Sequence, residues 1–323
     1  MARIKLIPAA IALSIALAAV GCSSSTGGNT TSGASGSAPA KTIKIGMSIT
    51  NLDQWLQLLA DSVKAEAAKQ GASVDIVSAE ASADTQLSQV ENFVAQKVDA
   101  IIVNPVDTDA AQAMTDAAQS AGVPLVYVNR CPAGLPSTVP CVGSDSKEAG
   151  TLEMDALGKL LNYKGTVGIL QGDPNNNGQA VRDRTAGCQA VVDQHSADMK
   201  VTMTGNGKWA RDAAQSVTEN WIQSGKLPDM ICANNDEMAL GAINALKAAG
   251  KLAQVKVGGI DATKDALTSM AAGELSVTVF QDANGQGSGA VDAAVKLVNK
   301  QSVDANINIP FQLVTKDNMS KFQ

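Results

Sequence analysis

Polar side chains crowd the points where apolar, strand-like runs of this sequence end. In MICANNDEMALGAINAL, residues 230–246, four apolar residues are followed at once by two asparagines, an aspartate and a glutamate, and a helix-like run begins there. Carboxylates accept hydrogen bonds, guanidinium groups donate them, and amides do both. These ends therefore predict a binding site for a molecule that carries several hydroxyl groups.

The same arrangement recurs at the other strand-like runs, in both halves of the chain. The candidate ligand-binding residues are Asp53, Trp55, Asn104, Asn129, Arg130, Arg182, Trp209, Asn235, Asp261 and Gln281. A tryptophan face suits the apolar C–H face of a sugar ring. Catalysis would need a nucleophile beside a base, and the pattern contains none, so it predicts binding and not an enzyme.

Each candidate also has a simpler structural interpretation. Asp53, Asp236 and Asp261 can cap helices, and Asn104 can be a turn residue before a proline. The arginines can form solvated ion pairs, and the tryptophans can be core residues at helix starts. The interpretations differ in one respect, since only a binding site requires these side chains to converge on one cleft.

The elements that position these residues alternate along the chain. Apolar runs such as IKIGMSI and DAIIVNP are separated by helix-like runs such as WLQLLADSVKAEAAKQG, and after VPCVGSD the pattern starts again. Apolar strands that alternate with amphipathic helices form a parallel sheet covered on both faces. We therefore predict an α/β fold with two doubly wound parallel-sheet lobes. In such sheets ligands bind outside the carboxyl ends of the strands, where the candidates stand.

Composition excludes several classes of site. The chain of 323 residues has a formal net charge of −6, and its lysines and arginines form no block, which argues against nucleic acid as a partner. Its single histidine, His195, rules out histidine-based triads and histidine-rich metal sites. The run GQGSGA at 285–290 lacks the G-x-G-x-x-G spacing of a dinucleotide loop and does not follow the opening strand. We therefore predict no cofactor and no metal.

The amino-terminal region has the pattern of an export signal. Arg3 and Lys5 precede an apolar run, and small residues then lead to Cys22. This order is typical of a secretory signal peptide, and a cysteine after Ala-Val-Gly resembles the signal of bacterial lipoproteins, in which that cysteine carries the lipid. We predict a signal peptide at 1–21, a lipidated Cys22 and a flexible Ser/Gly-rich linker at 22–41. A plain secreted protein with an unmodified Cys22 is the alternative.

Export makes disulfides chemically accessible to the four remaining cysteines. Cys131 and Cys141 flank a proline- and glycine-rich loop and can staple it, so they are a candidate disulfide. Cys188 lies in a helical run and Cys232 in an apolar one, where buried thiols and a second bridge both remain open.

Several stretches together point to a known family. The most specific are VGSDSKEAG, ANNDEMALGAINALKAAGK, VGGIDATKDAL and TVFQDANGQ, with KDNMSKF at the end. Through them the chain from Thr42 to Phe322 resembles the bacterial ABC-importer sugar-binding proteins of the ribose/galactose cluster. The resemblance implies the periplasmic binding protein fold of type I, with the ligand in a cleft between the lobes. The implied lobes are 42–144 plus 282–309 and 145–281 plus 310–323, and the implied hinge crossings lie near Gly143–Ser144, Gln281–Asp282 and Ile309–Phe311.

By motif, the resemblance assigns a role in ligand binding to each candidate. Asp53 would accept hydrogen bonds from hydroxyl groups, and Trp55 would be a platform for the ring, with Trp209 facing it from the other lobe. Asn129 stands where ribose binders commonly have aspartate, and the acidic residue, histidine and calcium loop of glucose/galactose binders are missing. The hydroxyl pattern of the ligand therefore differs, and VNRCPAGLPSTVPCVGSDS looks closer to relatives that bind inositol or polyols.

The resemblance implies transport without chemistry. The protein would be a monomer, held by its lipid at the extracytoplasmic side of the cell membrane or in the periplasm, that captures a monosaccharide, an inositol or a sugar alcohol and delivers it to an ABC permease. A cleft enzyme is one alternative. A sugar-responsive repressor is another, but it needs an amino-terminal helix-turn-helix where this chain has an export signal. A sensor that presents the ligand to a membrane receptor is left open by the sequence.

Overall fold

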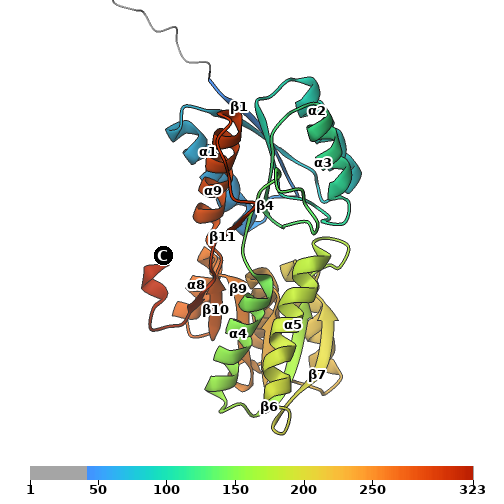
Figure 1. The fold of residues 1–323 in the computed structure, drawn as a ribbon. Coiled ribbons are helices and arrows are strands. Elements are labelled where there is room, and N and C mark those ends of the chain that lie inside the picture. The colour runs from blue at the N-terminus through green and yellow to red at the C-terminus, as the bar shows by residue number, and fades with distance from the viewer. Residues whose placement is uncertain (1–41, 323) are drawn as a thin grey trace, which may run out of the picture. The chain divides into compact units, whose positions relative to one another are not determined.

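The computed structural model describes residues 42–322, which form two lobes of similar construction (Figure 1). The predicted signal peptide, Cys22 and the linker at 22–41 lie outside the described residues. Within the described part, no helix combines the length and the apolar character needed to cross a membrane.

The first lobe is built on a six-stranded sheet with the strand order β11-β5-β4-β3-β1-β2. Its strands are β1 (Lys44–Ile49), β2 (Ser73–Ser78), β3 (Ala100–Val103), β4 (Leu125–Asn129), β5 (Cys141–Gly143) and β11 (Asn306–Asn308). Its helices are α1 (Gln54–Lys69), α2 (Ala83–Ala95), α3 (Ala111–Ser120) and α9 (Ala283–Val298). The strand pairs are parallel, and α1 packs with α9 on one face while α2 and α3 cover the other (Figure 1).

The second lobe repeats this plan with the strand order β12-β10-β9-β8-β6-β7. Its strands are β6 (Gly165–Gln171), β7 (Met199–Asn206), β8 (Met230–Ala233), β9 (Lys256–Asp261), β10 (Val277–Phe280) and β12 (Gln312–Val314). Its helices are α4 (Ser146–Leu160), α5 (Gly178–Gln194), α6 (Arg211–Gln223), α7 (Asp236–Ala248) and α8 (Lys264–Ala271), with short 3-10 turns η1 (Leu252–Gln254) and η2 (Met319–Lys321). The edge strand β12 runs antiparallel to β10, and the other pairs are parallel.

Successive residues of the central strands are buried on opposite faces of each sheet, because side chains alternate along a strand. In β8, Met230 and Cys232 pack toward α4 and α5, whereas Ile231 and Ala233 pack toward α6 and α7, and all four are fully buried. Helices on both faces explain why such strands read as continuous apolar runs. The predicted fold class of two doubly wound parallel-sheet lobes is confirmed.

Both sheets reverse their winding at the same place. In each lobe the chain runs from a central strand, β1 or β6, to an edge strand, β2 or β7, and then returns to the other side of the central strand as β3 or β8. The loops after the two neighbouring central strands leave toward opposite faces, so a crevice opens at their carboxyl ends. The candidates Asp53, Asn104 and Asn235 follow β1, β3 and β8 respectively.

The chain passes between the lobes three times. It does so from β5 to α4, from β10 to α9 and from β11 to β12. The passages are short, with residues 144–145, 281–282 and 309–311 lying between the elements they join. Their action as hinges stays a prediction.

Both cysteine pairs are bonded. The candidate disulfide Cys131–Cys141 is present and closes the loop between β4 and β5, with the Cα atoms 5.6 Å apart. Cys188 of α5 is bonded to Cys232 of β8, with the Cα atoms 6.8 Å apart. Of the two interpretations of this second pair, the structure selects the bridge, which ties α5 to the sheet.

Candidate functional site

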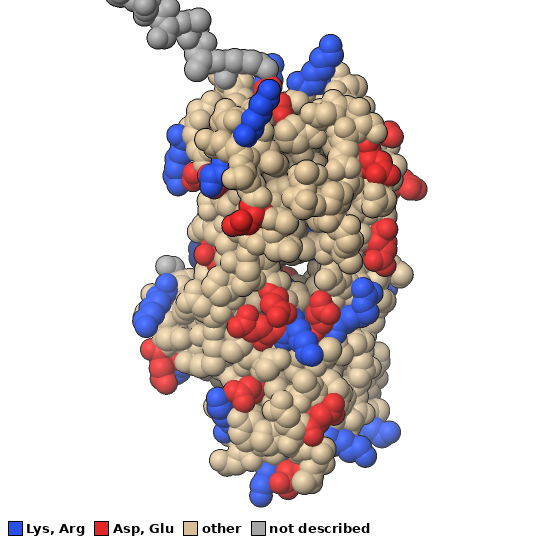
Figure 2. Space-filling view, in the orientation of Figure 1, with Lys and Arg blue, Asp and Glu red and all other residues tan. Residues whose placement is uncertain are grey.

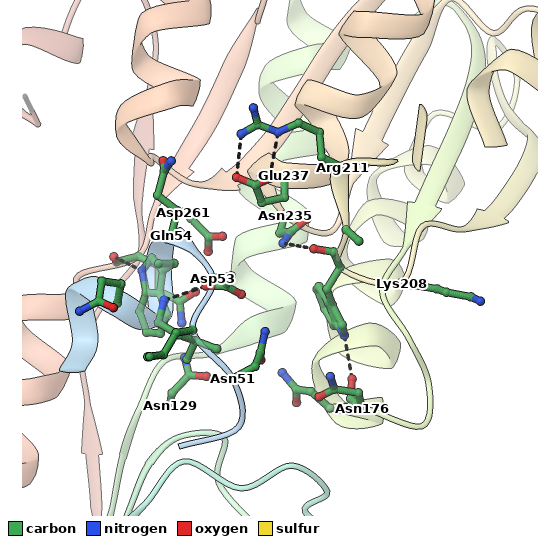
Figure 3. A pocket seen from close by; sticks show the side chains of 18 of the residues that line it. Asn51, Asp53, Gln54, Asn129, Asn176, Lys208, Arg211, Asn235, Glu237 and Asp261 are labelled. Carbon is green, nitrogen blue, oxygen red and sulfur yellow. Dashed lines mark hydrogen bonds and ion pairs between the residues drawn. The ribbon is translucent and has the colours of Figure 1, made fainter. Parts of the chain in front are cut away.

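A cavity of 680 Å³ is lined by residues from both lobes (Figure 3). This volume lies in the range of sites that hold small ligands. The cavity walls include eight of the ten candidates: Asp53, Trp55, Asn129, Arg130, Trp209, Asn235, Asp261 and Gln281. These side chains therefore converge on one cleft, as a binding site requires.

The start of α1 brings Asp53 and Trp55 to the cavity. Asp53 is the N-cap of this helix, and its Oδ1 accepts a hydrogen bond from the Leu56 N–H at 2.8 Å. Burial raises the pKa of Asp53, and the Leu56 hydrogen bond and the charge of Arg130 act in the opposite sense. The Trp55 indole is 5% exposed, and its Nε1 donates to the carbonyl oxygen of Gln281 at 2.9 Å. Asp53 thus combines the role of a cap with that of a cavity carboxylate.

Asn104 lies beneath the cavity wall and does not line it, which corrects its predicted role. The side chain is fully buried, and its Oδ1 accepts from the Thr50 hydroxyl at 2.9 Å. Its Nδ2 donates to the Asn129 Oδ1 at 3.3 Å. Protein groups therefore occupy this buried amide, and its contact with the cavity is the hydrogen bond to Asn129.

Asn129 is held at both ends of its amide. It receives the hydrogen bond from Asn104 and donates from Nδ2 to the Gln286 Oε1 of α9 at 3.2 Å. Gln286 is fully buried and in turn donates to the Ser144 hydroxyl at 2.8 Å, in the passage from β5 to α4. The φ of Asn129 is 69°, a left-handed conformation that asparagine tolerates better than most residues. The site is therefore connected by hydrogen bonds to one of the lobe crossings.

Arg130 is the buried cation of the first lobe. Its side chain donates from Nη1 to the Pro105 carbonyl at 2.9 Å and to the Asn176 Oδ1 at 2.8 Å. Burial lowers the pKa of Arg130 to about 10, while Asp53 acts to raise it. Its buried Nε has no hydrogen-bond partner among the described residues. Arg130 therefore lines the cavity with one buried donor unused.

The arginine that α5 brings to the cavity is Arg184, which corrects the predicted Arg182. Arg182 is exposed on α5, whereas Arg184 is 6% exposed and lines the cavity. Side chains two residues apart on a helix point in directions about 200° apart, so only one of these two arginines can face the sheet. Arg184 shares the inner face with Val181 and Cys188, three and four residues away, and both are buried. This apolar spacing in the sequence was the signal that distinguishes the two arginines.

Arg184 joins several elements of the second lobe. Its Nη1 donates to the Asn234 carbonyl at 2.6 Å, and its Nη2 donates to the Gln281 Oε1 at 2.9 Å. The Asp261 carboxylate lies 4.0 Å from Nη1, and the Trp209 ring centroid lies 5.8 Å from the guanidinium carbon. Burial lowers the pKa of Arg184, and Asp261 is the strongest influence in the opposite direction. This guanidinium therefore positions groups at the ends of β8 and β10.

Trp209 follows β7 and stands against the end of β6. Its Nε1 donates to the Asn176 carbonyl at 2.7 Å. A Cβ at Gly172 would lie 2.0 Å from the indole Cε2, so the ring packs directly against that glycine. The φ of Trp209 is 62°, a left-handed conformation that is uncommon for a bulky residue. The loop thus accepts backbone strain to present the indole to the cavity.

Asn235 is the N-cap of α7, which answers why polar residues stand at the end of β8. Its Oδ1 accepts from the Met238 N–H at 3.0 Å, and its Nδ2 donates to the Trp209 carbonyl at 3.4 Å (Figure 3). The neighbouring Asp236 is fully buried and accepts from the Thr278 hydroxyl at 2.7 Å. Asp236 therefore ties α7 to β10, while Asn235 faces the cavity.

Asp261 ends β9 in an unusual conformation. Its φ is 126°, in a region that non-glycine residues rarely adopt, and such strain typically costs about 1–3 kcal/mol. The side chain is 8% exposed, and burial raises its pKa well above the usual range, while Arg184 acts in the opposite sense. Retained strain of this kind is characteristic of sites that hold a ligand.

The inner wall of the cavity pairs carboxyl groups with guanidinium groups. Two carboxylates, Asp53 and Asp261, stand with two buried guanidinium groups, Arg130 and Arg184. A charge brought into such a site without a partner would be costly, because buried ions must be paired. The arrangement therefore favours a neutral guest that both accepts and donates hydrogen bonds.

Several rim residues were missed by the sequence analysis. Arg211 binds Glu237 through two hydrogen bonds of 2.8 and 2.9 Å and donates to Asp265 at 2.9 Å. The Asp265 N–H donates to the Gln54 Oε1 of the first lobe at 3.3 Å. Glu237 stood in the polar run after β8, but its pairing with Arg211 spans segments that no local pattern connects. Lys208 is exposed and lies at the rim of the cavity, with its side chain extending outward (Figure 3).

One group of residues has the composition of a metal site. Among the described residues, Glu153, Cys188 and Cys232 bring their ligand atoms within 4.8 Å of one another. The two sulfurs are bonded to each other, so they are not free thiolates and cannot act as the ligands that a zinc site requires. On the face shown in Figure 2, lysines and arginines lie interspersed with acidic side chains, unlike a continuous basic surface for nucleic acid.

Comparisons with known sequences agree with this geometry. A model of the periplasmic binding protein domain matches residues 45–302. A putative rhizopine-binding protein of Rhizobium meliloti is 47% identical over 243 residues, which cover 74% of this chain and 78% of that protein. A xylitol-binding protein of Mycolicibacterium smegmatis is 35% identical over 236 residues, which cover 73% of this chain and 66% of that protein.

A solved structure resembles both lobes. It is an ABC transporter solute binding protein from Bacillus halodurans with bound myo-inositol, and it matches with a TM-score of 0.83 at 41% sequence identity. The match covers 87% of this chain and 97% of that one.

Proposed function

The chain belongs to the periplasmic binding protein family, and from that premise we propose that it captures a neutral polyhydroxy molecule outside the cytoplasm and delivers it to an ABC importer permease. The guest is a monosaccharide, an inositol or a sugar alcohol. No covalent chemistry is involved, and the chain works as a monomer.

The observation that carries this proposal is the pairing of carboxyl and guanidinium groups on the inner cavity wall. Asp53 and Asp261 offer acceptors, while Arg130 and Arg184 offer donors, and the two kinds come from both lobes. A hydroxyl group donates and accepts at once, so a ring of hydroxyls can satisfy this wall without bringing in a charge. The indoles of Trp55 and Trp209 supply apolar faces for the C–H groups.

Binding in this proposal draws the lobes together. Closure excludes water from the guest and strengthens each hydrogen bond in the less polar surroundings. A guest that lacks one hydroxyl leaves a buried carboxylate or amide unpaired, and this provides selectivity. The guest must favour the closed form over the open form in order to shift the population. An affinity in the micromolar range corresponds to about −8 kcal/mol.

The relatives support a polyol as the guest. The names or titles of two of the three relatives described above refer to xylitol and myo-inositol, which are neutral and carry several hydroxyl groups, and the third is named for rhizopine. The predicted lipid on Cys22 completes the proposal, because a tethered protein would stay near its permease at the membrane surface.

Calorimetric titration of the purified full chain tests the proposal. We expect myo-inositol, xylitol or ribose to bind with micromolar or tighter affinity, and glucuronate and glucosamine, which carry a charge, to bind at least about 100-fold more weakly. Uptake of the bound polyol should fall in a strain that lacks the protein. Tighter binding of a charged analogue, or no binding of any neutral polyol, would overturn the proposed ligand class. Unchanged uptake would instead assign the protein to sensing.

A further inference from the structure

The loop between β6 and α5 contacts both lobes at the edge of the cavity. Asn176 in this loop accepts a hydrogen bond at its side-chain Oδ1 from Arg130 of the first lobe, at 2.8 Å. Its backbone carbonyl accepts from the Trp209 Nε1 of the second lobe, at 2.7 Å (Figure 3). One residue thus connects the buried cation of one lobe with the indole of the other.

A second bond from the same loop crosses the cleft. The Asn177 N–H donates to the Val106 carbonyl of the first lobe at 3.1 Å. Asn177 is 8% exposed, has a left-handed φ of 62°, and caps α5 by accepting from the Ala180 N–H at 3.4 Å. The cap fixes the loop to α5, the helix that carries Arg184, so the loop is anchored to the second lobe before it reaches across.

Arg130 makes one side-chain hydrogen bond to the other lobe. The other hydrogen bonds of its side chain among the described residues go to Thr50, Pro105 and Val106, all in the first lobe. Asn176 supplies its acceptor from the second lobe. A hydrogen bond to a charged group is stronger than one between neutral groups. Of the two contacts that the loop makes across the cleft, the one with Arg130 is therefore stronger than the one with Val106.

We propose that Asn176 is a positioning residue that clasps the closed lobes and thereby sets how fast a bound polyol is released. This inference rests on the proposed function. When the lobes separate, the bond between Asn176 and Arg130 must break, so Arg130 loses this acceptor while Trp209 keeps its bond to the Asn176 carbonyl. In this proposal the bond forms only as the lobes close, so it does not affect the first encounter with the polyol.

The substitution that tests this role is Asn176→Ala, which removes the accepting oxygen and keeps the backbone carbonyl that holds Trp209. Asn176→Asp keeps an oxygen at the same place and should restore the contact with Arg130. The neighbouring Asn175 is exposed, and Asn175→Ala is the matched control.

Stopped-flow fluorescence with myo-inositol and with xylitol gives the rates for the wild type and the three variants. We expect Asn176→Ala to release the polyol about 10-fold faster with an unchanged association rate and an unchanged melting temperature in the absence of polyol. Asn175→Ala should release it at about the wild-type rate, and Asn176→Asp, which pairs a carboxylate with Arg130, at that rate or more slowly. Equal release from Asn176→Ala and the wild type, or a loss confined to the association rate, would overturn the clasp alone. A wild type that binds neither polyol would instead overturn the proposed function on which the clasp rests.

Discussion

Replacing Arg184 by methionine is the sharpest test of how the cavity is held. The change keeps an unbranched side chain of similar length but removes the guanidinium that donates to Asn234 at 2.6 Å and to Gln281 at 2.9 Å. Each hydrogen bond to a charged group contributes about 1.5–3 kcal/mol. The change also leaves the buried carboxylate of Asp261 without the cation 4.0 Å away. We expect the free energy of unfolding to fall by about 3–5 kcal/mol and the affinity for myo-inositol to fall by about 100-fold.

The neighbouring arginine supplies the control. Arg182 lies two residues away on the same helix and is exposed, so Arg182→Ala should change the free energy of unfolding by less than about 0.5 kcal/mol and leave the affinity unchanged. Arg184→Lys keeps the charge but loses the planar fork, and it should be intermediate in both quantities. Urea unfolding measures the stability of each variant, and titration calorimetry measures its affinity.

Two results would refute this reasoning. Equal losses of affinity in the variants at Arg182 and Arg184 would mean that the helix presents its other face to the ligand. Wild-type affinity in both Arg184→Met and Arg184→Lys would mean that the guanidinium does not organise the cavity.

Two further predictions concern buried groups at strand ends. Burial raises the pKa of Asp236 from 3.8 to about 7, so the folded protein keeps a proton that the unfolded chain loses. The free energy of unfolding should therefore fall as the pH rises from about 4 to about 7, and Asp236 should contribute up to about 1.4 kcal/mol per pH unit. In Asp236→Asn, the unfolding free energy measured with urea should depend less steeply on pH. An equally steep dependence in the variant and the wild type would contradict this. Gly172→Ala would place a methyl group 2.0 Å from the Trp209 ring and should weaken polyol binding about 10-fold in calorimetry, whereas Gly178→Ala, which meets only the flexible end of a side chain at 3.2 Å, should not.

The fold was predictable because each strand and each helix carries its own pattern. Apolar runs buried on both faces, such as β8, read as continuous hydrophobic segments, and the amphipathic helices between them require a parallel arrangement. The family resemblance drawn from the polar runs after these strands is confirmed by the match to residues 45–302.

The place of Asp53 and Asp261 beside the cavity was predictable, because the carboxyl end of a parallel strand and the loop after it determine where they lie. The place of Asn104 was not, since it directly follows β3 but is fully buried beneath the cavity wall. Arg182 and Arg184 differ only in their helical phase on α5, which puts Arg184 on the buried face. The contacts of Asn176 have no local signal, because its partners lie far away in the sequence, on two different lobes.

The bridge from Cys188 to Cys232 was undecided for the same reason. Their separation in the sequence is 44 residues, and nothing local to either cysteine indicates the other. Pairings of this kind are set by the packing of α5 on the sheet, which exists only in the folded molecule.

The connection from Asn129 through Gln286 to Ser144 limits how this protein could be adapted to new guests. A substitution at Asn129 made to suit a different molecule would also remove the donor that bonds to Gln286 and the acceptor that bonds to Asn104. It would thereby loosen the passage at Ser144, which Gln286 holds. A substitution at this position therefore changes the ligand preference and the lobe motion together. A designer who wants a new specificity with the original closing behaviour would have to alter all four side chains at once.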